Sequence, residues 1–122
     1  MNDYRPVIRW LLVFIWVLVI LFFSSQPNLQ SGLDPLSEFI AGNGAHAAEY
    51  FVLTFLLLRA LRSPRALWLA AGLTLLAALG DELYQQHIAG RQSSLYDVLA
   101  DLSGILTLVL LQLPYGKNLP HQ

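Results

Sequence analysis

Apolar residues occur along this chain in four long runs, and shorter polar segments separate them. The first run contains fourteen consecutive apolar residues, from 10 to 23. Each run is near the length of about 20 residues that an α-helix needs to cross the hydrocarbon core of a bilayer. Together the runs predict an all-α fold, a small integral-membrane bundle of four transmembrane helices at about residues 7–23, 45–61, 66–84 and 95–113.

The segment between the first two runs, residues 24–44, is polar and contains no Lys or Arg. Within it Asp34 precedes Pro35, and an N-cap residue followed by proline is typical of a helix start. We therefore expect a short interfacial helix that ends near Gly42. Between the second and third runs, Pro64 leaves a loop of only a few residues, which predicts a tight antiparallel pair.

Basic residues indicate the orientation of the helices. In a four-helix arrangement, six of the seven Lys and Arg residues fall on one side, namely Arg5, Arg9, Arg59, Arg62, Arg65 and Lys117. Because basic residues favour cytoplasmic loops, both termini are expected in the cytoplasm. A positive start before an apolar run also fits a cleavable signal peptide. The sequence F-F-S-S-Q after the run is not a small-residue cleavage site, which favours a retained helix.

Composition supports a membrane protein and excludes several functions. Hydrophobic residues make up 56% and charged residues 12% of the 122 residues, whereas charged residues are about 25% of a typical soluble protein. The length fits one domain, covering residues 1–122. A net charge of −1 provides no basic surface for nucleic acid. The absence of cysteine excludes disulfides, thiolate metal sites and cysteine nucleophiles.

Charged residues are concentrated between Gly80 and Gly104, a stretch that holds four of the eight acidic residues. The two glycines are expected to let helices pack closely. Under the predicted topology, this stretch shares the extracytoplasmic level with the end of the first helix and the start of the second. Ionisable groups within membrane spans are expensive and usually functional. We therefore predict one ligand-binding site formed by Gln26, His46, Glu49, Asp81, Glu82, Gln85, Arg91, Asp97 and Asp101.

Spacing indicates how these side chains could interact. His46 and Glu49 are three residues apart, and Asp97 and Asp101 are four apart, so each pair shares a helix face. One alternative is purely structural, with Glu49 paired to His46 and Arg91 paired to Asp97. The site nevertheless holds more carboxylates than cations, which requires either protonated carboxyls or an added cation.

Two kinds of chemistry follow from that imbalance. A divalent metal would suit His46, Glu49, Asp81 and Asp101, but no spacing here is diagnostic of a metal site. A protonated carboxyl beside an ionised one also divides general acid and base roles. The candidates for catalysis are then Glu49, Asp81 and Asp101. The sequence specifies neither a cofactor nor an oligomeric state.

Five motifs occur in a fixed order: F-F-S-S-Q-P, H-A-A-E-Y, D-E-L-Y-Q, G-R and S-L-Y-D-V-L-A-D-L-S-G, at residues 22–27, 46–50, 81–85, 90–91 and 94–104. In order and spacing the chain resembles the VanZ-like membrane proteins from about residue 20 to 113. The family often has Asn where this chain has Asp101, and Lys where it has Asn43.

The resemblance implies a small multi-helix protein of the bacterial inner membrane and a link to the cell envelope. The family takes its name from a member associated with resistance to the glycopeptide antibiotic teicoplanin. We therefore expect an outward-facing site for the head group of an envelope lipid or a lipoglycopeptide. The alternatives are a membrane-embedded hydrolase or transferase acting on a lipid-linked substrate, and a structural scaffold. A transporter is disfavoured because the first and third helices show no polar path through their middles.

Overall fold

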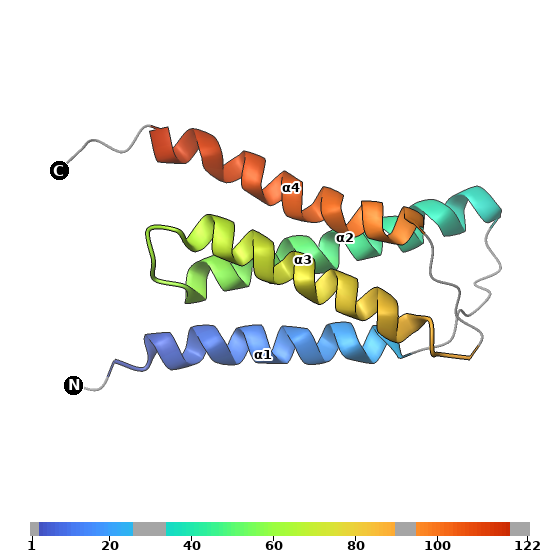
Figure 1. The fold of residues 1–122 in the computed structure, drawn as a ribbon, viewed down its shortest axis with the longest axis horizontal. Helices are drawn as coiled ribbons and strands as arrows, with labels where there is room; N and C mark the ends of the chain where they lie inside the picture. The colour runs from blue at the N-terminus through green and yellow to red at the C-terminus, as the bar shows by residue number, and fades with distance from the viewer. Residues whose placement is uncertain (1–2, 26–33, 90–94, 118–122) are drawn as a thin grey trace.

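The computed structural model describes residues 3–25, 34–89 and 95–117, and these residues form four α-helices and no strand. The helices are α1 (Arg5–Ser24), α2 (Pro35–Ala60), α3 (Ala66–Gln85) and α4 (Leu95–Lys117) (Figure 1). The predicted all-α class is confirmed, whereas the described residues form four helices instead of the four spans and separate interfacial helix that were expected.

The helices run side by side; α2 and α3 each contact all the others, and α2 makes the most extensive contacts (Figure 1). Helices α1 and α4 lie on opposite sides of the α2–α3 pair and do not contact each other. The predicted antiparallel pairing of α2 with α3 is confirmed, because only residues 61–65 separate them. A site built from three or four helices must therefore lie along α2 or α3.

Helix α2 differs from the prediction, because the expected interfacial helix and the second apolar run form one continuous helix of 26 residues. Asp34 is its N-cap, as predicted, and accepts hydrogen bonds from the backbone N–H of Ser37 at 3.2 Å and from its hydroxyl at 2.6 Å. Gly42 and Gly44 were expected to end the short helix. Each glycine costs a helix only about 1 kcal/mol, and no proline follows Pro35 within α2 to remove a backbone donor.

Helix α4 also continues beyond its predicted end at residue 113 and stops at Lys117. The proline at position 114 lacks a backbone N–H and was expected to stop the helix. The helix instead continues through it without the one backbone hydrogen bond that this N–H would donate to the carbonyl four residues earlier.

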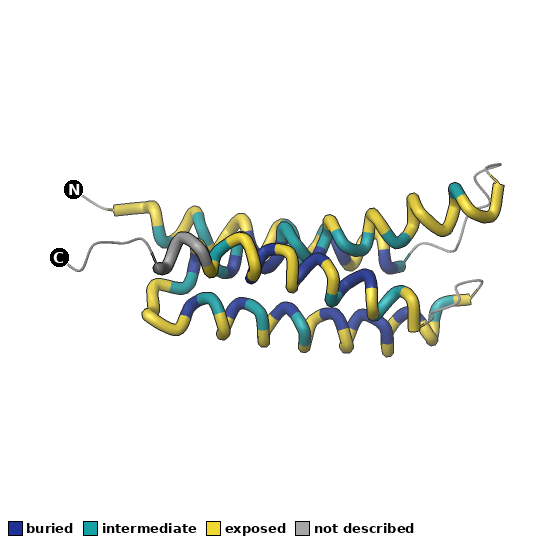
Figure 2. The backbone as a smooth tube through the Cα atoms, turned by 90° about the horizontal axis from the view of Figure 1, so that it is seen from above, coloured by how far each residue is buried: buried dark blue, intermediate teal, exposed yellow. Residues whose placement is uncertain are grey.

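Three helical segments are long and apolar enough to cross a membrane, namely Arg5–Ser24, Ala66–Gln85 and Leu95–Leu113. Large apolar side chains are exposed on these helices, including Phe14, Leu76 and Leu110 at 60%, 67% and 63% exposure. Exposed positions recur along every helix in Figure 2. An apolar surface this extensive suits lipid rather than water. Helix α2 is not among the three segments, so its crossing of the membrane stays a prediction.

The core between the helices depends on small residues as well as large ones. A Cβ placed on Gly104 would overlap the backbone carbonyl of Ala47, so α4 lies directly on α2 at this point. The predicted packing role of Gly104 is therefore confirmed. The same role for Gly80 is wrong, because a Cβ there would meet nothing within 4 Å. The two buried threonines, Thr54 and Thr74, each donate to the carbonyl four residues earlier in their own helix, at 2.7 and 2.8 Å.

The bundle separates its charges between its two ends. The beginning of α1, the α2–α3 turn and the end of α4 share one end (Figure 1), and the Lys and Arg residues of the described chain lie there. The end of α3, the beginning of α4 and the N-terminal half of α2 carry seven of the acidic residues, namely Asp34, Glu38, Glu49, Asp81, Glu82, Asp97 and Asp101.

Candidate functional site

Polar side chains from α2, α3 and α4 meet in the interior at the acidic end of the bundle. Helix α2 supplies two of them one turn apart, the last turn of α3 supplies three, and the second turn of α4 supplies one. We call this set the buried acid cluster: His46, Tyr50, Asp81, Glu82, Gln85 and Asp101. Tyr50, Gln85 and Asp101 are fully buried, and Asp81 and Glu82 are each only 6% exposed.

One half of the cluster joins α2 to α4. His46 Nδ1 lies 3.1 Å from Asp101 Oδ1, and the two side chains are 11% and 0% exposed. The pair is held by the backbone next to it. Ala47 follows His46, Gly104 lies one turn after Asp101, and these two residues form the close approach of the helices. Close packing therefore fixes the distance between the imidazole and the carboxylate.

The other half of the cluster joins α1, α2 and α3. The Tyr50 hydroxyl donates to Asp81 Oδ2 at 2.7 Å, and Gln85 Nε2 donates to the same oxygen at 3.1 Å. Gln85 Nε2 also donates to the Ser24 hydroxyl at 3.3 Å. Asp81 and Gln85 are four residues apart and so share a helix face. This network is a chain of neutral donors around one carboxylate oxygen.

Several oxygens in the cluster are buried without a hydrogen-bond partner among the described residues. They are Asp81 Oδ1, Glu82 Oε1 and Oε2, Gln85 Oε1 and Asp101 Oδ2. Buried polar atoms are paired in the great majority of native proteins, so each exception requires an explanation. Five such oxygens occur together in the buried acid cluster.

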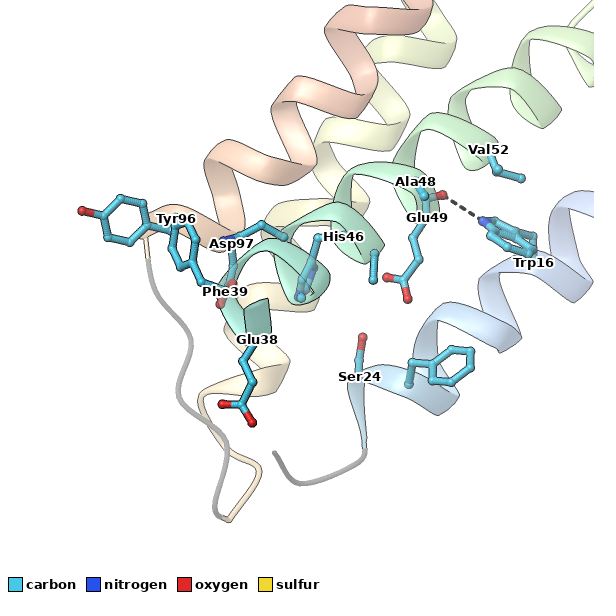
Figure 3. Close-up of a pocket in the computed structure, with 14 residues that line it drawn as sticks. Trp16, Ser24, Glu38, Phe39, His46, Ala48, Glu49, Val52, Tyr96 and Asp97 are labelled. Carbon is cyan, nitrogen blue, oxygen red and sulfur yellow. Dashed lines mark hydrogen bonds between the residues drawn. The ribbon is translucent and has the colours of Figure 1, made fainter. Parts of the chain in front are cut away.

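A cavity of about 600 Å³ opens beside the cluster, between α1 and the N-terminal parts of α2 and α4. Its apolar lining includes Trp16, Phe23, Phe39, Val52 and Tyr96, and its ionisable lining consists of Glu38, His46, Glu49 and Asp97 (Figure 3). We call it the amphiphilic pocket, because aromatic rings and carboxylates share its walls.

Two contacts fix the walls of the amphiphilic pocket. The Trp16 indole N–H donates to the backbone carbonyl of Glu49 at 2.9 Å, drawn as a dashed line in Figure 3, and attaches α1 to α2. The rings of Phe39 and Tyr96 meet edge to face with centroids 5.5 Å apart, which attaches α2 to α4. His46 belongs both to this pocket and to the buried acid cluster, so the two share a wall.

The chain was compared with protein families, curated proteins and solved structures. The family model described as VanZ/LLP1 matches residues 9–113. The chain belongs to the VanZ/LLP1 family. No curated protein and no solved structure matches it. The matched residues include the whole buried acid cluster and every residue that lines the amphiphilic pocket.

The structure of this VanZ/LLP1 protein assigns places to seven of the nine predicted site residues. Five of them, His46, Asp81, Glu82, Gln85 and Asp101, lie in the buried acid cluster. Glu49 and Asp97 line the amphiphilic pocket instead. Gln26 and Arg91 lie outside the described residues, and so does the suggested pairing of Arg91 with Asp97.

The residues that could hold a metal ion differ from the predicted candidates. Within the described chain, one ligand atom each from His46, Glu82 and Asp101 lie within 4.8 Å of one another. The sequence pointed to Glu49 and Asp81, which do not belong to this group. Asp81 is instead turned to Tyr50 and Gln85, and Glu49 lies at the pocket wall.

Sequence reasoning missed Tyr50 and Trp16 as members of the site. Tyr50 lies four residues after His46 and therefore on the same face of α2, a spacing that could have identified it. Trp16 carries no comparable signal, because it lies within fourteen consecutive apolar residues. Its role is visible only in the structure, where its indole donates to the Glu49 carbonyl and its ring lines the pocket.

Proposed function

We propose that this VanZ/LLP1 protein binds an amphiphilic molecule of the cell envelope in the amphiphilic pocket. The pocket would hold the head group of an envelope lipid or of a teicoplanin-type lipoglycopeptide. The observation that carries the proposal is the lining of the pocket. Aromatic and aliphatic side chains suit the apolar part of such a molecule, and Glu38, Glu49 and Asp97 suit its polar part. Family membership supports a link to glycopeptide resistance.

The charge of the lining indicates which head groups fit. Among the described residues, three carboxylates and one imidazole line the pocket, and no Lys or Arg does. Carboxylates accept hydrogen bonds and attract cations. A head group rich in amino or hydroxyl groups therefore suits this pocket better than a bare phosphate.

The pocket would open at the outer surface of the bacterial inner membrane. Basic residues favour the cytoplasmic side, and those that the structure describes gather at the end opposite to the pocket. Under this orientation both termini are cytoplasmic and α2 crosses the membrane as the fourth span. A membrane-impermeant thiol reagent tests it, because the chain has no cysteine of its own. The reagent should label D34C and not S63C in intact cells, and the reverse pattern would refute the orientation.

Binding can be tested by filling the pocket. Val52 lines it, whereas Leu76 on α3 is 67% exposed and lines neither the pocket nor the core. We expect V52W to lose binding of teicoplanin and of phosphatidylethanolamine, measured by native mass spectrometry of detergent-purified protein. L76W, the matched control, should bind as the wild type does. Equal binding by the two variants, or no binding of either probe by the wild type, would refute the proposal.

One observation favours an enzyme as the second candidate. The carboxylates of the buried acid cluster adjoin the pocket through His46 and have unpartnered oxygens, and clustered buried carboxyls are typical of acid–base sites. A membrane-embedded hydrolase or transferase acting on a lipid-linked substrate would use Asp101, Asp81 or Glu49. Catalysis predicts that D101N retains ligand binding and loses turnover of that substrate, whereas a binding protein shows no turnover to lose.

A further inference from the structure

We propose that His46, Glu82 and Asp101 bind one divalent transition-metal cation, of the zinc or manganese type, at the inner wall of the amphiphilic pocket. The three residues come from three different helices, α2, α3 and α4. One ligand atom from each lies within 4.8 Å of the others. Glu82 is 6% exposed and Asp101 is fully buried. The proposal does not depend on the ligand-binding function proposed above.

The unpartnered oxygens provide the second line of support. Both carboxylate oxygens of Glu82 and Oδ2 of Asp101 are buried without a hydrogen-bond partner among the described residues. Removing carboxylates from water without compensation is unfavourable, and a positive charge restores the balance. Within the described chain every Lys and Arg lies at the opposite end of the bundle. A cation bound between the two carboxylates would supply the positive charge that the described residues around them lack.

The distances are compatible with coordination. Ligands about 2.0–2.2 Å from a zinc ion lie about 3.0–3.5 Å from each other. His46 Nδ1 and Asp101 Oδ1 are already 3.1 Å apart, and the contact of Gly104 with Ala47 holds them there. Glu82 completes the group from α3 within the 4.8 Å limit. Its side chain has three rotatable bonds, so a movement of about an ångström does not require the helices to move.

The ligand types narrow the choice of ion. Carboxylates suit magnesium, calcium and manganese, whereas imidazole suits zinc, iron and the later transition metals. Calcium takes six to eight oxygen ligands. Magnesium also prefers oxygen ligands and retains several of its waters. Two carboxylates with one imidazole therefore favour zinc or manganese. Because His46 also lines the pocket, an open coordination position would face the cavity.

The alternative is that protons, rather than a metal, neutralise the cluster. A hydrogen shared between His46 and Asp101 also gives a separation of 3.1 Å. The two explanations differ in what E82Q should do. If protons neutralise the site, the neutral isostere changes little, because it replaces a protonated carboxyl. If a metal binds, E82Q removes a ligand and with it the dependence of stability on the ion.

The experiment uses the full-length protein in mild detergent, with any affinity tag removed and with metals stripped by EDTA. Zinc and manganese are then added separately, excess ion is removed, and the bound ion is counted by inductively coupled plasma mass spectrometry. We expect about one ion per chain in the wild type. Affinity should fall by more than about 100-fold in E82Q and D101N, since loss of a ligand should exceed the effect of losing an outer partner. D3N and H87Q, which change exposed residues outside the pocket and the buried acid cluster, should bind as the wild type does.

Unfolding measurements keep the test informative when a variant is unstable. Zinc or manganese should raise the unfolding midpoint of the wild type and D3N, and leave that of E82Q unchanged. E82Q should fold, because the amide has the shape of the carboxylate without its charge. A wild type that takes up neither ion would overturn the proposal, and so would an E82Q protein that binds and responds like the wild type. Stabilisation by calcium or magnesium alone would overturn the assigned class of ion.

Discussion

Replacing Gly104 with alanine tests the contact that holds the His46–Asp101 half of the buried acid cluster. A Cβ at this position would lie 2.9 Å from the carbonyl carbon and 3.1 Å from the Cα of Ala47, and would overlap the carbonyl oxygen. Carbon atoms in contact normally lie about 3.5–4.0 Å apart. The obstacle is backbone rather than a flexible side chain, so only a separation of α2 and α4 by about 1 Å can relieve it.

The size of the effect follows from two opposing terms. Overpacking a well-packed interior costs typically about 1–3 kcal/mol. Replacing glycine by alanine inside a helix contributes about 0.5–1 kcal/mol in the other direction. We therefore expect G104A to lose about 1–2 kcal/mol of unfolding free energy, which lowers the ratio of folded to unfolded protein roughly 5- to 30-fold. The same separation should move His46 away from Asp101.

Unfolding by sodium dodecyl sulfate in mixed micelles measures this loss, followed by tryptophan fluorescence. Trp16 is a suitable probe because its indole joins α1 to α2 through the Glu49 carbonyl. The matched control is G72A, at an exposed helical position where a Cβ meets nothing within 4 Å. The control should be as stable as the wild type or more stable. If G104A and G72A unfold at the same fraction of sodium dodecyl sulfate, the close approach of α2 and α4 is not what holds the site.

Two further predictions concern single hydrogen-bonded groups. Y50F removes the hydroxyl that donates to Asp81 at 2.7 Å and should cost about 1–3 kcal/mol in the same assay. Y84F, at an exposed position, should stay within about 0.5 kcal/mol of the wild type, and equal losses would contradict the role of the buried bond. D34A should speed hydrogen exchange at the Ser37 amide. The two hydrogen bonds from Ser37 lower the pKa of Asp34, so protection of this amide should persist at neutral pH and disappear only as pH falls through that lowered pKa. Loss of protection above about pH 5 would refute this assignment.

The sequence predicted the helices well because membrane spans depend on one property, the length of an apolar run. It predicted the junction of α2 poorly because local signals there conflict. Gly42 and Gly44 disfavour a helix, and Asp34 and Pro35 start one. Whether the helix continues through the glycines depends on how much the residues after them gain from packing against α3 and α4. A local sequence pattern carries no information about that packing.

The convergence of polar groups on one end of the bundle followed from topology alone, but their pairing did not. Successive residues of an α-helix point about 100° apart, so Asp81 and Glu82 face different neighbours although both are buried. Asp81 meets Tyr50, and Glu82 belongs to the group with His46 and Asp101. Which carboxylate faces which partner depends on the rotation of α3 about its axis, and only tertiary packing sets that rotation.

Helix α2 shows why the site and the weakest hydropathy signal coincide. It contacts every other helix, and it is not among the segments apolar enough to be candidate spans. Its polar groups lower its mean hydropathy. Those near its ends, such as Glu38 and Arg59, are exposed, but several of the others are covered. Tyr50 and Thr54 are fully buried, and His46 and Glu49 line the pocket. Polar groups within a membrane bundle are tolerated where other helices or a cavity cover them. A helix that other helices surround can therefore carry polar side chains. The same side chains make α2 less hydrophobic than the three candidate spans.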